Sequence, residues 1–214
     1  MPADDRHSLL ETGNLLMVEE RERYFAHLMR KRGIDSLEGL RFFEAGCAGG
    51  YNLRMFVQLG ARPENVAGMD LDGASVDYCR ARASDIIVHH GSADSIPEGA
   101  ASFDISIAYT LFSSVPAEAI SQGIANELVR ITTPGGLILL YDMRRKSPRN
   151  KSVHPISRTD IERWFAGNAI GSRSITLAPP AARIIGRRLP GLYGLFAAVP
   201  ILRTHAFYVI RRGR

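Results

Sequence analysis

Short apolar runs alternate with helical patterns across the middle of this chain, and that alternation constrains its fold more than any other feature. The runs are LRFFEAG, NVAGMDL, DIIVHHG, FDISIAYTL and LILLYDM, and helical spacing follows the first, second and fourth of them. Strand–helix alternation with short loops is typical of right-handed crossovers and a parallel sheet. We therefore expect an α/β fold with a Rossmann-like, doubly wound and mostly parallel sheet.

Further elements flank this alternating core. Helical spacing predicts a helix from Leu15 to Lys31, and two strands, SRSITLA and AFYVIRR, are expected near the C-terminus. A stretch rich in Pro, Arg and Gly separates those two strands. We expect a single domain over 1–214, with an N-terminal helical segment (1–39), a cofactor-binding core (40–142), and an acceptor-side part (143–214) that has an insertion at about 179–205.

Composition favours a protein of the cytoplasm. The chain has 214 residues, 45% of them hydrophobic, and its two cysteines lack the spacing of a metal site or a disulfide framework. The N-terminus carries acids and lacks the apolar segment of a signal peptide. The longest apolar run, Leu189 to Leu202, is interrupted by prolines and glycines and is shorter than the ~20 residues that a bilayer span needs.

Charge is divided unevenly along the chain. Residues 1–140 contain 12 Lys and Arg against 19 Asp and Glu, whereas residues 141–214 contain 15 against 3. Arginine-rich helix faces can simply be solvated. The alternative is that the C-terminal third faces an anionic partner, such as an acidic substrate, a membrane surface or a nucleic acid.

The stretch FFEAGCAGG ends the first predicted strand in a glycine-rich loop. Ligands of open parallel sheets bind beyond the carboxyl ends of the strands, where glycines allow close approach. Ala48 stands where the dinucleotide pattern G-x-G-x-x-G has its second glycine, and Glu44 precedes the loop. A carboxylate there would repel a pyrophosphate and attract a cation, such as the ammonium group of an amino acid.

A second acid follows the second predicted strand. Asp70 in GMDLD is placed to accept hydrogen bonds from two ribose hydroxyls, and Leu71 could cover one face of an adenine. The predicted ligand thus has a ribose, an adenine and a positive amino group, but no phosphates. S-adenosylmethionine fits that description.

These residues resemble a known family. FFEAGCAGG, VAGMDLD and GSADSIPEGAASFDISIAY, in this order, are similar to the motifs of the class I S-adenosylmethionine-dependent methyltransferases, of the small-molecule or lipid type with ubiquinone/menaquinone methyltransferase-like motifs. The resemblance covers roughly Leu40 to Asp142. It implies a seven-stranded sheet whose last strand is antiparallel.

The resemblance also implies roles for individual residues. Glu44 and the loop would line the methionine portion, Ala93 would contact the adenine edge, and Tyr109 would sit between cofactor and acceptor. Ala48 is tolerable if its φ stays negative. Ser92 replaces the acid that usually binds the adenine amino group, so either Ser92 or Asp94 is expected to take that role. The full set is Glu44, Gly46, Cys47, Ala48, Gly49, Gly50, Asp70, Leu71, Ser92, Ala93, Asp94 and Tyr109.

Catalysis of methyl transfer depends mainly on positioning, and an oxygen acceptor also needs a base. The candidates after the fourth and fifth strands are Tyr109, Asp142 and His154, and His205 is a weaker fourth. No clustered Asp/His arrangement indicates a metal-dependent enzyme. Cys47 is expected to be a small loop residue rather than a nucleophile.

The expected function is therefore methyl transfer from S-adenosylmethionine to the oxygen or nitrogen of a small acceptor. Arg183, Arg187, Arg188 and Arg203 surround apolar residues in the insertion, which could form a lid for an amphipathic or acidic acceptor. The same segment could instead touch an anionic membrane or form a homodimer contact. Methylation of RNA or of membrane lipid, a nicotinamide-dependent oxidoreductase, and an inactive nucleotide-binding module are the alternatives. Nucleic acid is a disfavoured partner, because no aromatic-interleaved basic patch is present.

Overall fold

A computed structural model describes residues 8–145 and 154–213, so most of the predicted polar loop RRKSPRNKSVHP and the first seven residues lie outside the described part. The described chain forms two compact units. The sheet unit comprises Ser36–Ser172 and the chain from Phe207, and the helical unit comprises the N-terminal segment up to Asp35 together with Arg173–Ala206.

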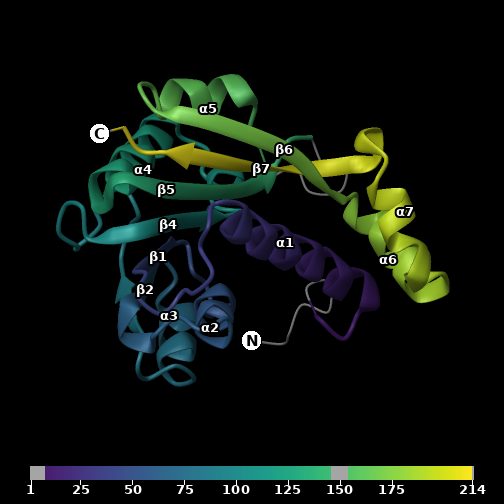
Figure 1. The fold of residues 1–214 in the computed structure, drawn as a ribbon, viewed down its shortest axis with the longest axis horizontal. Coiled ribbons are helices and arrows are strands. Elements are labelled where there is room, and N and C mark those ends of the chain that lie inside the picture. Colours follow the sequence, from purple (N-terminus) through teal and green to yellow (C-terminus); the bar gives the residue numbers. More distant parts are fainter. Residues whose placement is uncertain (1–7, 146–153, 214) are drawn as a thin grey trace. The chain divides into compact units, whose positions relative to one another are not determined.

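The sheet has seven strands in the order β3-β2-β1-β4-β5-β7-β6 (Figure 1). Strands β1 to β5 are parallel where they pair with one another. Arg212, directly after β7, exchanges backbone hydrogen bonds with Gly135 and Gly136 of β5 (3.1 and 3.0 Å), which is the pattern of an antiparallel pair. The predicted doubly wound sheet with an antiparallel last strand is therefore confirmed. The strands are β1 (Phe42–Ala45), β2 (Val66–Asp70), β3 (Ile87–His90), β4 (Phe103–Tyr109), β5 (Thr132–Met143), β6 (Ala169–Leu177) and β7 (Arg203–Arg211).

Among the described residues, three of the four α-helices of the sheet unit begin at a side-chain cap or a glycine. Asp72 caps α3, because its carboxylate accepts from the backbone N–H groups of Ala74 and Ser75 (both 3.3 Å). Ser157 and Asp160 form a capping box at the start of α5. The elements are α2 (Tyr51–Gln58), α3 (Gly73–Arg80), α4 (Glu118–Ile131) and α5 (Arg158–Trp164), with short 3-10 helices η2 (Pro63–Asn65) and η3 (Phe112–Ser114).

The fifth strand starts earlier than the sequence indicates. The apolar run LILLYDM predicts a strand from Leu137, but β5 begins at Thr132 and includes Pro134, Gly135 and Gly136. The ladder with β4 pairs Phe103 with Thr132 and then Ile105 with Leu137, so an irregularity in the register absorbs the extra residues. Gly135 takes the left-handed conformation (φ 79°) that this irregularity requires.

The helical unit is built on a close contact between α1 (Thr12–Lys31) and α6 (Pro179–Arg188). A Cβ atom added to Gly186 would lie 2.4 Å from the backbone nitrogen of Gly13, so only glycine permits this approach. After α6 follow η4 (Pro190–Leu192), α7 (Tyr193–Ala197) and η5 (Pro200–Leu202). Among the described residues, no helix combines the length and the apolar character needed to cross a bilayer.

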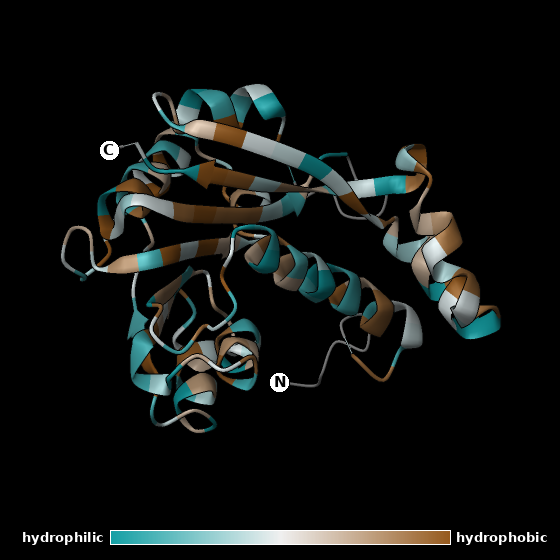
Figure 2. Ribbon diagram, viewed as in Figure 1, coloured by the Kyte–Doolittle hydropathy of each residue, from teal (hydrophilic) through white to brown (hydrophobic). Residues whose placement is uncertain are grey.

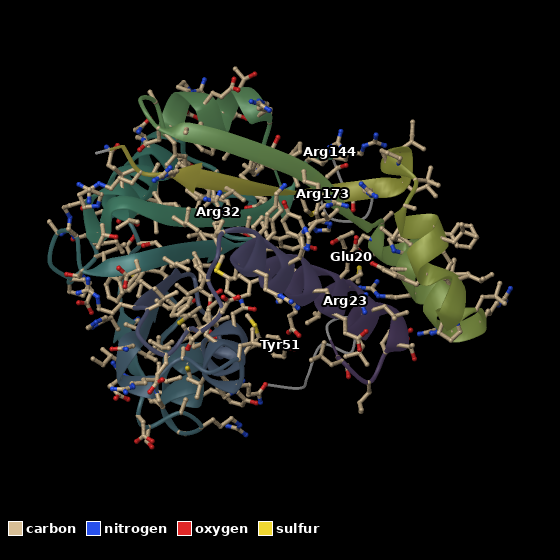
Figure 3. The ribbon with its side chains drawn as sticks, in the orientation of Figure 1. Glu20, Arg23, Arg32, Tyr51, Arg144 and Arg173 are labelled. Atoms are coloured by element: carbon tan, nitrogen blue, oxygen red, sulfur yellow. The ribbon has the colours of Figure 1, made fainter. Side chains whose placement is uncertain are left out.

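Polar side chains hold the predicted insertion to α1. Glu20, which is labelled in Figure 3, accepts from the hydroxyl of Tyr193 (2.7 Å) and from the backbone N–H of Thr176 (3.2 Å). Arg187 pairs with Glu11 (Nε to Oε2, 2.8 Å), and Arg183 donates to the Asn14 side chain (3.1 Å). The 179–205 stretch is thus mostly helical and belongs to the same compact unit as the N-terminal helix.

Candidate active site

Glu44 lies near the carboxyl end of β1 and is buried, with 1% of its surface exposed. Asn52, in the first turn of α2, donates its side-chain amide to Glu44 Oε1 at 2.5 Å. Between them runs the glycine loop, in which Gly46 and Gly50 both have φ 73°. Arg54 donates to the carbonyl of Gly49 (2.8 Å) and braces the loop. The carboxylate therefore has a fixed orientation beside the loop.

The expectation that Ala48 keeps a negative φ was wrong, because its φ is 44°. The loop alternates left-handed residues at positions 46, 48 and 50, so Ala48 adopts the conformation that glycine has elsewhere in the loop. Its backbone N–H donates to Asp70 Oδ2 at 2.7 Å, and this bond offsets part of the strain, which is about 1–2 kcal/mol for a left-handed L-residue.

Asp70 ends β2, next to the glycine loop. Its Oδ1 accepts from the backbone N–H of Asp72 (2.9 Å) while Oδ2 accepts from Ala48. A carboxylate offers about four acceptor positions, so these two bonds fix its plane and leave acceptor capacity for hydroxyl groups. The adjacent Leu71 is 72% exposed, and its carbonyl lies 3.1 Å from His90 Nε2. An acid and an exposed apolar side chain therefore stand together at this strand end.

The loop after β3 contains the two candidates for the adenine amino group. Gly91 N–H donates to the carbonyl of Asp70 (3.0 Å), which ties this loop to the end of β2. Ala93 is buried, Ser92 is half-buried, and the Asp94 side chain is exposed. The assignment of Ser92 or Asp94 to the adenine amino group stays a prediction.

Tyr109 ends β4 and is buried in an aromatic cluster of the sheet unit. Its ring makes edge contacts with Tyr141 (centroids 5.9 Å apart) and Phe207 (5.7 Å). The next residue, Thr110, has φ 54°, a strained conformation for a β-branched residue, and its N–H donates to Tyr141 (2.7 Å). Strain of this kind clusters at functional sites, and here it turns the chain sharply beyond the strand.

Asp142, near the end of β5, is buried and holds the η3 turn. Its Oδ2 accepts from the backbone N–H of Ser113 (3.1 Å), and its Oδ1 accepts from the N–H of Met143 (2.8 Å). Burial raises the pKa of Asp142 above its ordinary value, and the hydrogen bonds from Ser113, Met143 and Phe112 counteract that rise. On the other side of the turn, the Phe112 ring stacks on Trp164 (5.2 Å).

His154 comes to the same turn from the chain after β5. Its backbone N–H donates to the carbonyl of Ser113 (2.8 Å), and its side chain is exposed. Two of the predicted catalytic residues, Asp142 and His154, are thus joined through Ser113. The weaker candidate, His205, is buried in the helical unit. Burial raises the pKa of the Cys47 thiol, so this thiol stays protonated.

Sequence reasoning missed three residues that build this site. Asn52 orients Glu44, His90 holds the Leu71 carbonyl, and Ser113 links Asp142 to His154. A signal for Asn52 was present, because the first turn of a helix that follows a glycine loop faces the end of the strand before it. No local pattern marks Ser113, whose partners are 29 and 41 residues away in the chain.

The residues at these strand ends fit S-adenosylmethionine by their chemistry. Glu44 and Asp70 are acceptor-only carboxylates, which suit an ammonium group and two ribose hydroxyls. They end neighbouring parallel strands, since Glu44 is in register with Gly68 and Ala45 with Met69. Leu71 adds an exposed apolar surface for a ring face.

Comparisons with known proteins agree with this chemistry. Residues 43–140 match a family model described as a methyltransferase domain. A probable S-adenosylmethionine-dependent methyltransferase of Mycolicibacterium smegmatis is 29% identical over 107 residues, which are 50% of this chain and 39% of that protein. The chain therefore spans well under half the length of this curated relative.

Solved structures with the same fold are distant in sequence. A putative sarcosine dimethylglycine methyltransferase from Galdieria sulphuraria has a TM-score of 0.66 at 14% identity, over 90% of this chain and 85% of that one. The [4+2]-cyclase SpnF has a TM-score of 0.64 at 14% identity, over 90% and 81%. Because the second is named for a cyclisation, the shared fold leaves the reaction open. Residues 43–140 thus match a methyltransferase domain, the chain shares the fold of these solved structures, and the two strand-end acids fit S-adenosylmethionine as the cofactor.

Proposed function

We propose that this chain transfers a methyl group from S-adenosylmethionine to an oxygen or nitrogen of a small, amphipathic or acidic acceptor. The observation that carries the proposal is the pair of acids at adjacent strand ends, Glu44 braced by Asn52 and Asp70 braced by Ala48. A phosphate-binding loop would lack the first acid, since a carboxylate repels a pyrophosphate.

The residues of the chain would act mainly by positioning. The bound cofactor supplies a methyl group that is already activated on a sulfonium, so the protein has to align an acceptor and exclude water. The strained Thr110 and the η3 turn end β4, and Asp142 fixes that turn. Asp142 is buried and its oxygens accept backbone N–H groups, so its contacts favour a positioning role over that of a base.

His154 is the better candidate for the base. Its backbone is tied to the turn while its imidazole is exposed, so the ring can reach an acceptor hydroxyl and take its proton. Proton transfer by a positioned side chain typically contributes about 100- to 10,000-fold to the rate.

A different arginine, outside the insertion, is the better candidate to bind an acidic acceptor. Of the four arginines of the insertion, Arg183 donates to Asn14 and Arg187 pairs with Glu11. Arg203 donates to the carbonyls of Ala197, Ser174 and Ala198, and Arg188 is exposed in the helical unit. Arg144, which follows Asp142 by two residues at the carboxyl end of β5, is exposed (Figure 3). An exposed guanidinium at this strand end suits a carboxylate or phosphate, which supports an acidic acceptor.

The test is a methyl-transfer assay with an isotopically labelled donor against fractionated small metabolites, lipids and RNA. The expected result is label in a small-molecule fraction, with S-adenosylhomocysteine formed in equal amount. With the acceptor in hand, His154→Gln should lower turnover about 100-fold or more and leave the affinity for S-adenosylhomocysteine unchanged. His27→Gln, an exposed histidine of α1, is the control.

Three outcomes contradict the proposal. Label in the RNA or membrane-lipid fraction alone would replace the acceptor class. Donor binding without transfer to any fraction would favour an inactive module or a different reaction on the same fold. Equal turnover of His154→Gln and the unaltered protein would remove His154 from the mechanism.

A further inference from the structure

The end of the helical unit exposes an array of apolar side chains. Leu195 and Ile201 are 68% and 69% exposed, well above the exposure of a side chain at the edge of a core. Figure 2 shows apolar residues along α6 and α7. Clusters of this kind, unlike single exposed leucines, mark interaction sites. We call this set the apolar face; it comprises Ile184, Leu189, Leu192, Leu195, Val199, Ile201 and Leu202.

Other residues of the same segment already form its buried core, so the exposed apolar residues are not needed for that core. Tyr193 and Ala197 are buried with Leu177 and Ala182, and Phe196 packs against this cluster. The Tyr193 hydroxyl is anchored on Glu20, which fixes the rotation of α7. The residues of the apolar face are therefore exposed while other residues of the same segment form a packed cluster.

The segment that forms the apolar face carries charges of one sign in its own sequence. No Asp or Glu occurs after Glu162 in the whole sequence, so the segment that forms the face has no acid of its own. Arg188 is exposed at the end of α6, directly before Leu189. Two acids of the neighbouring N-terminal segment contact this segment and are engaged: Glu11, the N-cap residue of α1, pairs with Arg187, and Glu20 accepts from the Tyr193 hydroxyl. The face thus combines apolar side chains with cationic ones.

An anionic lipid bilayer complements this combination better than a second copy of the chain does. In a symmetric dimer the same patch meets itself, which would bring together two segments that contain arginines and no acid of their own. A bilayer with anionic headgroups offers a hydrocarbon boundary for the leucines and negative charge for the arginines. We propose that the apolar face docks this protein onto the surface of anionic membranes.

The experiment is co-sedimentation of the full chain with vesicles of phosphatidylcholine and phosphatidylglycerol, and with vesicles of phosphatidylcholine alone. Binding is expected to the anionic vesicles and to weaken with added salt. The double variant Leu195→Gln/Ile201→Gln should weaken it about 30-fold, from roughly 1 kcal/mol per partly buried side chain. Arg188→Gln should weaken it about fivefold, since a cation at such a surface contributes roughly 1 kcal/mol.

Matched controls distinguish binding through the apolar face from nonspecific binding to vesicles. Leu59→Gln/Ile87→Gln removes two exposed apolar side chains of the sheet unit, and Arg32→Gln removes an exposed cation beyond the far end of α1. Both controls should bind vesicles as the unaltered protein does, and thermal unfolding should show that all variants are folded.

Three results would overturn the proposal. The first is no binding to anionic vesicles. The second is equal loss of binding in the face and control variants. The third is a concentration-dependent dimer in sedimentation velocity that Leu195→Gln/Ile201→Gln abolishes, because a second copy would then cover the face. None of these results bears on donor binding in the sheet unit, so the proposed function is tested separately.

Discussion

His205 should make the stability of this protein fall as the pH drops from 7 to 5. Burial of its ring in the helical unit lowers the pKa of His205 from 6.5 to about 4, and the charge of Arg21 adds to the effect. Below pH 6.5 the unfolded chain takes up a proton that the folded chain does not bind. The contribution of His205 to the free energy of unfolding is therefore fully present above pH 6.5 and is lost as the pH falls toward 4.

The magnitude follows from the two pKa values. Each pH unit between them costs up to about 1.4 kcal/mol, so His205 should lower the free energy of unfolding by roughly 2 kcal/mol between pH 7 and pH 5. Other groups titrate in the same range, so the difference between the unaltered protein and His205→Gln isolates this histidine.

Urea unfolding at pH 7 and pH 5 measures that difference. His205→Gln should be the less stable protein at pH 7, because a buried ring is replaced, and should lose about 2 kcal/mol less on acidification. His27→Gln, which alters an exposed histidine of α1, is the matched control. An equal pH dependence of the unaltered protein and His205→Gln would refute the argument that burial keeps this ring neutral.

Two glycine-related substitutions give further tests by thermal or urea unfolding. Ala48→Gly should raise the free energy of unfolding by up to about 1 kcal/mol, because Ala48 has a left-handed φ. Ala74→Gly, on the exposed side of α3, is the control and should lower the free energy of unfolding by about 0.5–1 kcal/mol. A loss of stability at both positions would contradict the loop geometry. Gly186→Ala should lower the free energy of unfolding by about 1–3 kcal/mol or more, since its Cβ would lie 2.4 Å from the Gly13 nitrogen. Gly191→Ala is the control and should change stability little, because a Cβ there would meet nothing within 4 Å. Similar effects of the two substitutions would argue against the α1–α6 contact.

The fold of the sheet unit was predictable because hydrophobic runs and loop glycines are local signals. The strand–helix alternation indicated the parallel sheet, and parallel strands bring their carboxyl ends to one edge, which placed Glu44 near Asp70 without any contact information. The same logic brought Asp142 and His154 to one region, where Ser113 joins them.

What the sequence could not indicate depends on contacts between distant residues. The helix α6 looked irregular because Gly186 and two prolines lower helix propensity, but the prolines start the helix and Gly186 meets Gly13 of α1. The left-handed φ of Ala48 is accompanied by a hydrogen bond to Asp70, which lies 22 residues away in the chain. In both cases tertiary packing overrides local propensity.

The partners of the basic residues were equally hidden. An arginine-rich stretch is compatible with solvent, with a ligand or with acids elsewhere in the chain. The structure engages Arg187 with Glu11 and Arg183 with Asn14, and so changes which cations remain available to a substrate or a membrane.

Calorimetric titration with S-adenosylmethionine tests the central claim most directly, with Glu44→Gln beside the unaltered protein. The claim is that Glu44 turns the glycine loop into a site for an ammonium group. The unaltered protein should bind S-adenosylmethionine and not NAD, and Glu44→Gln should bind about 10- to 100-fold more weakly, as expected for a lost charge-assisted hydrogen bond of roughly 1.5–3 kcal/mol. Glu64→Gln, an exposed glutamate in η2, should bind normally. Binding of NAD in preference to S-adenosylmethionine, or equal affinity of Glu44→Gln and the unaltered protein, would contradict the account.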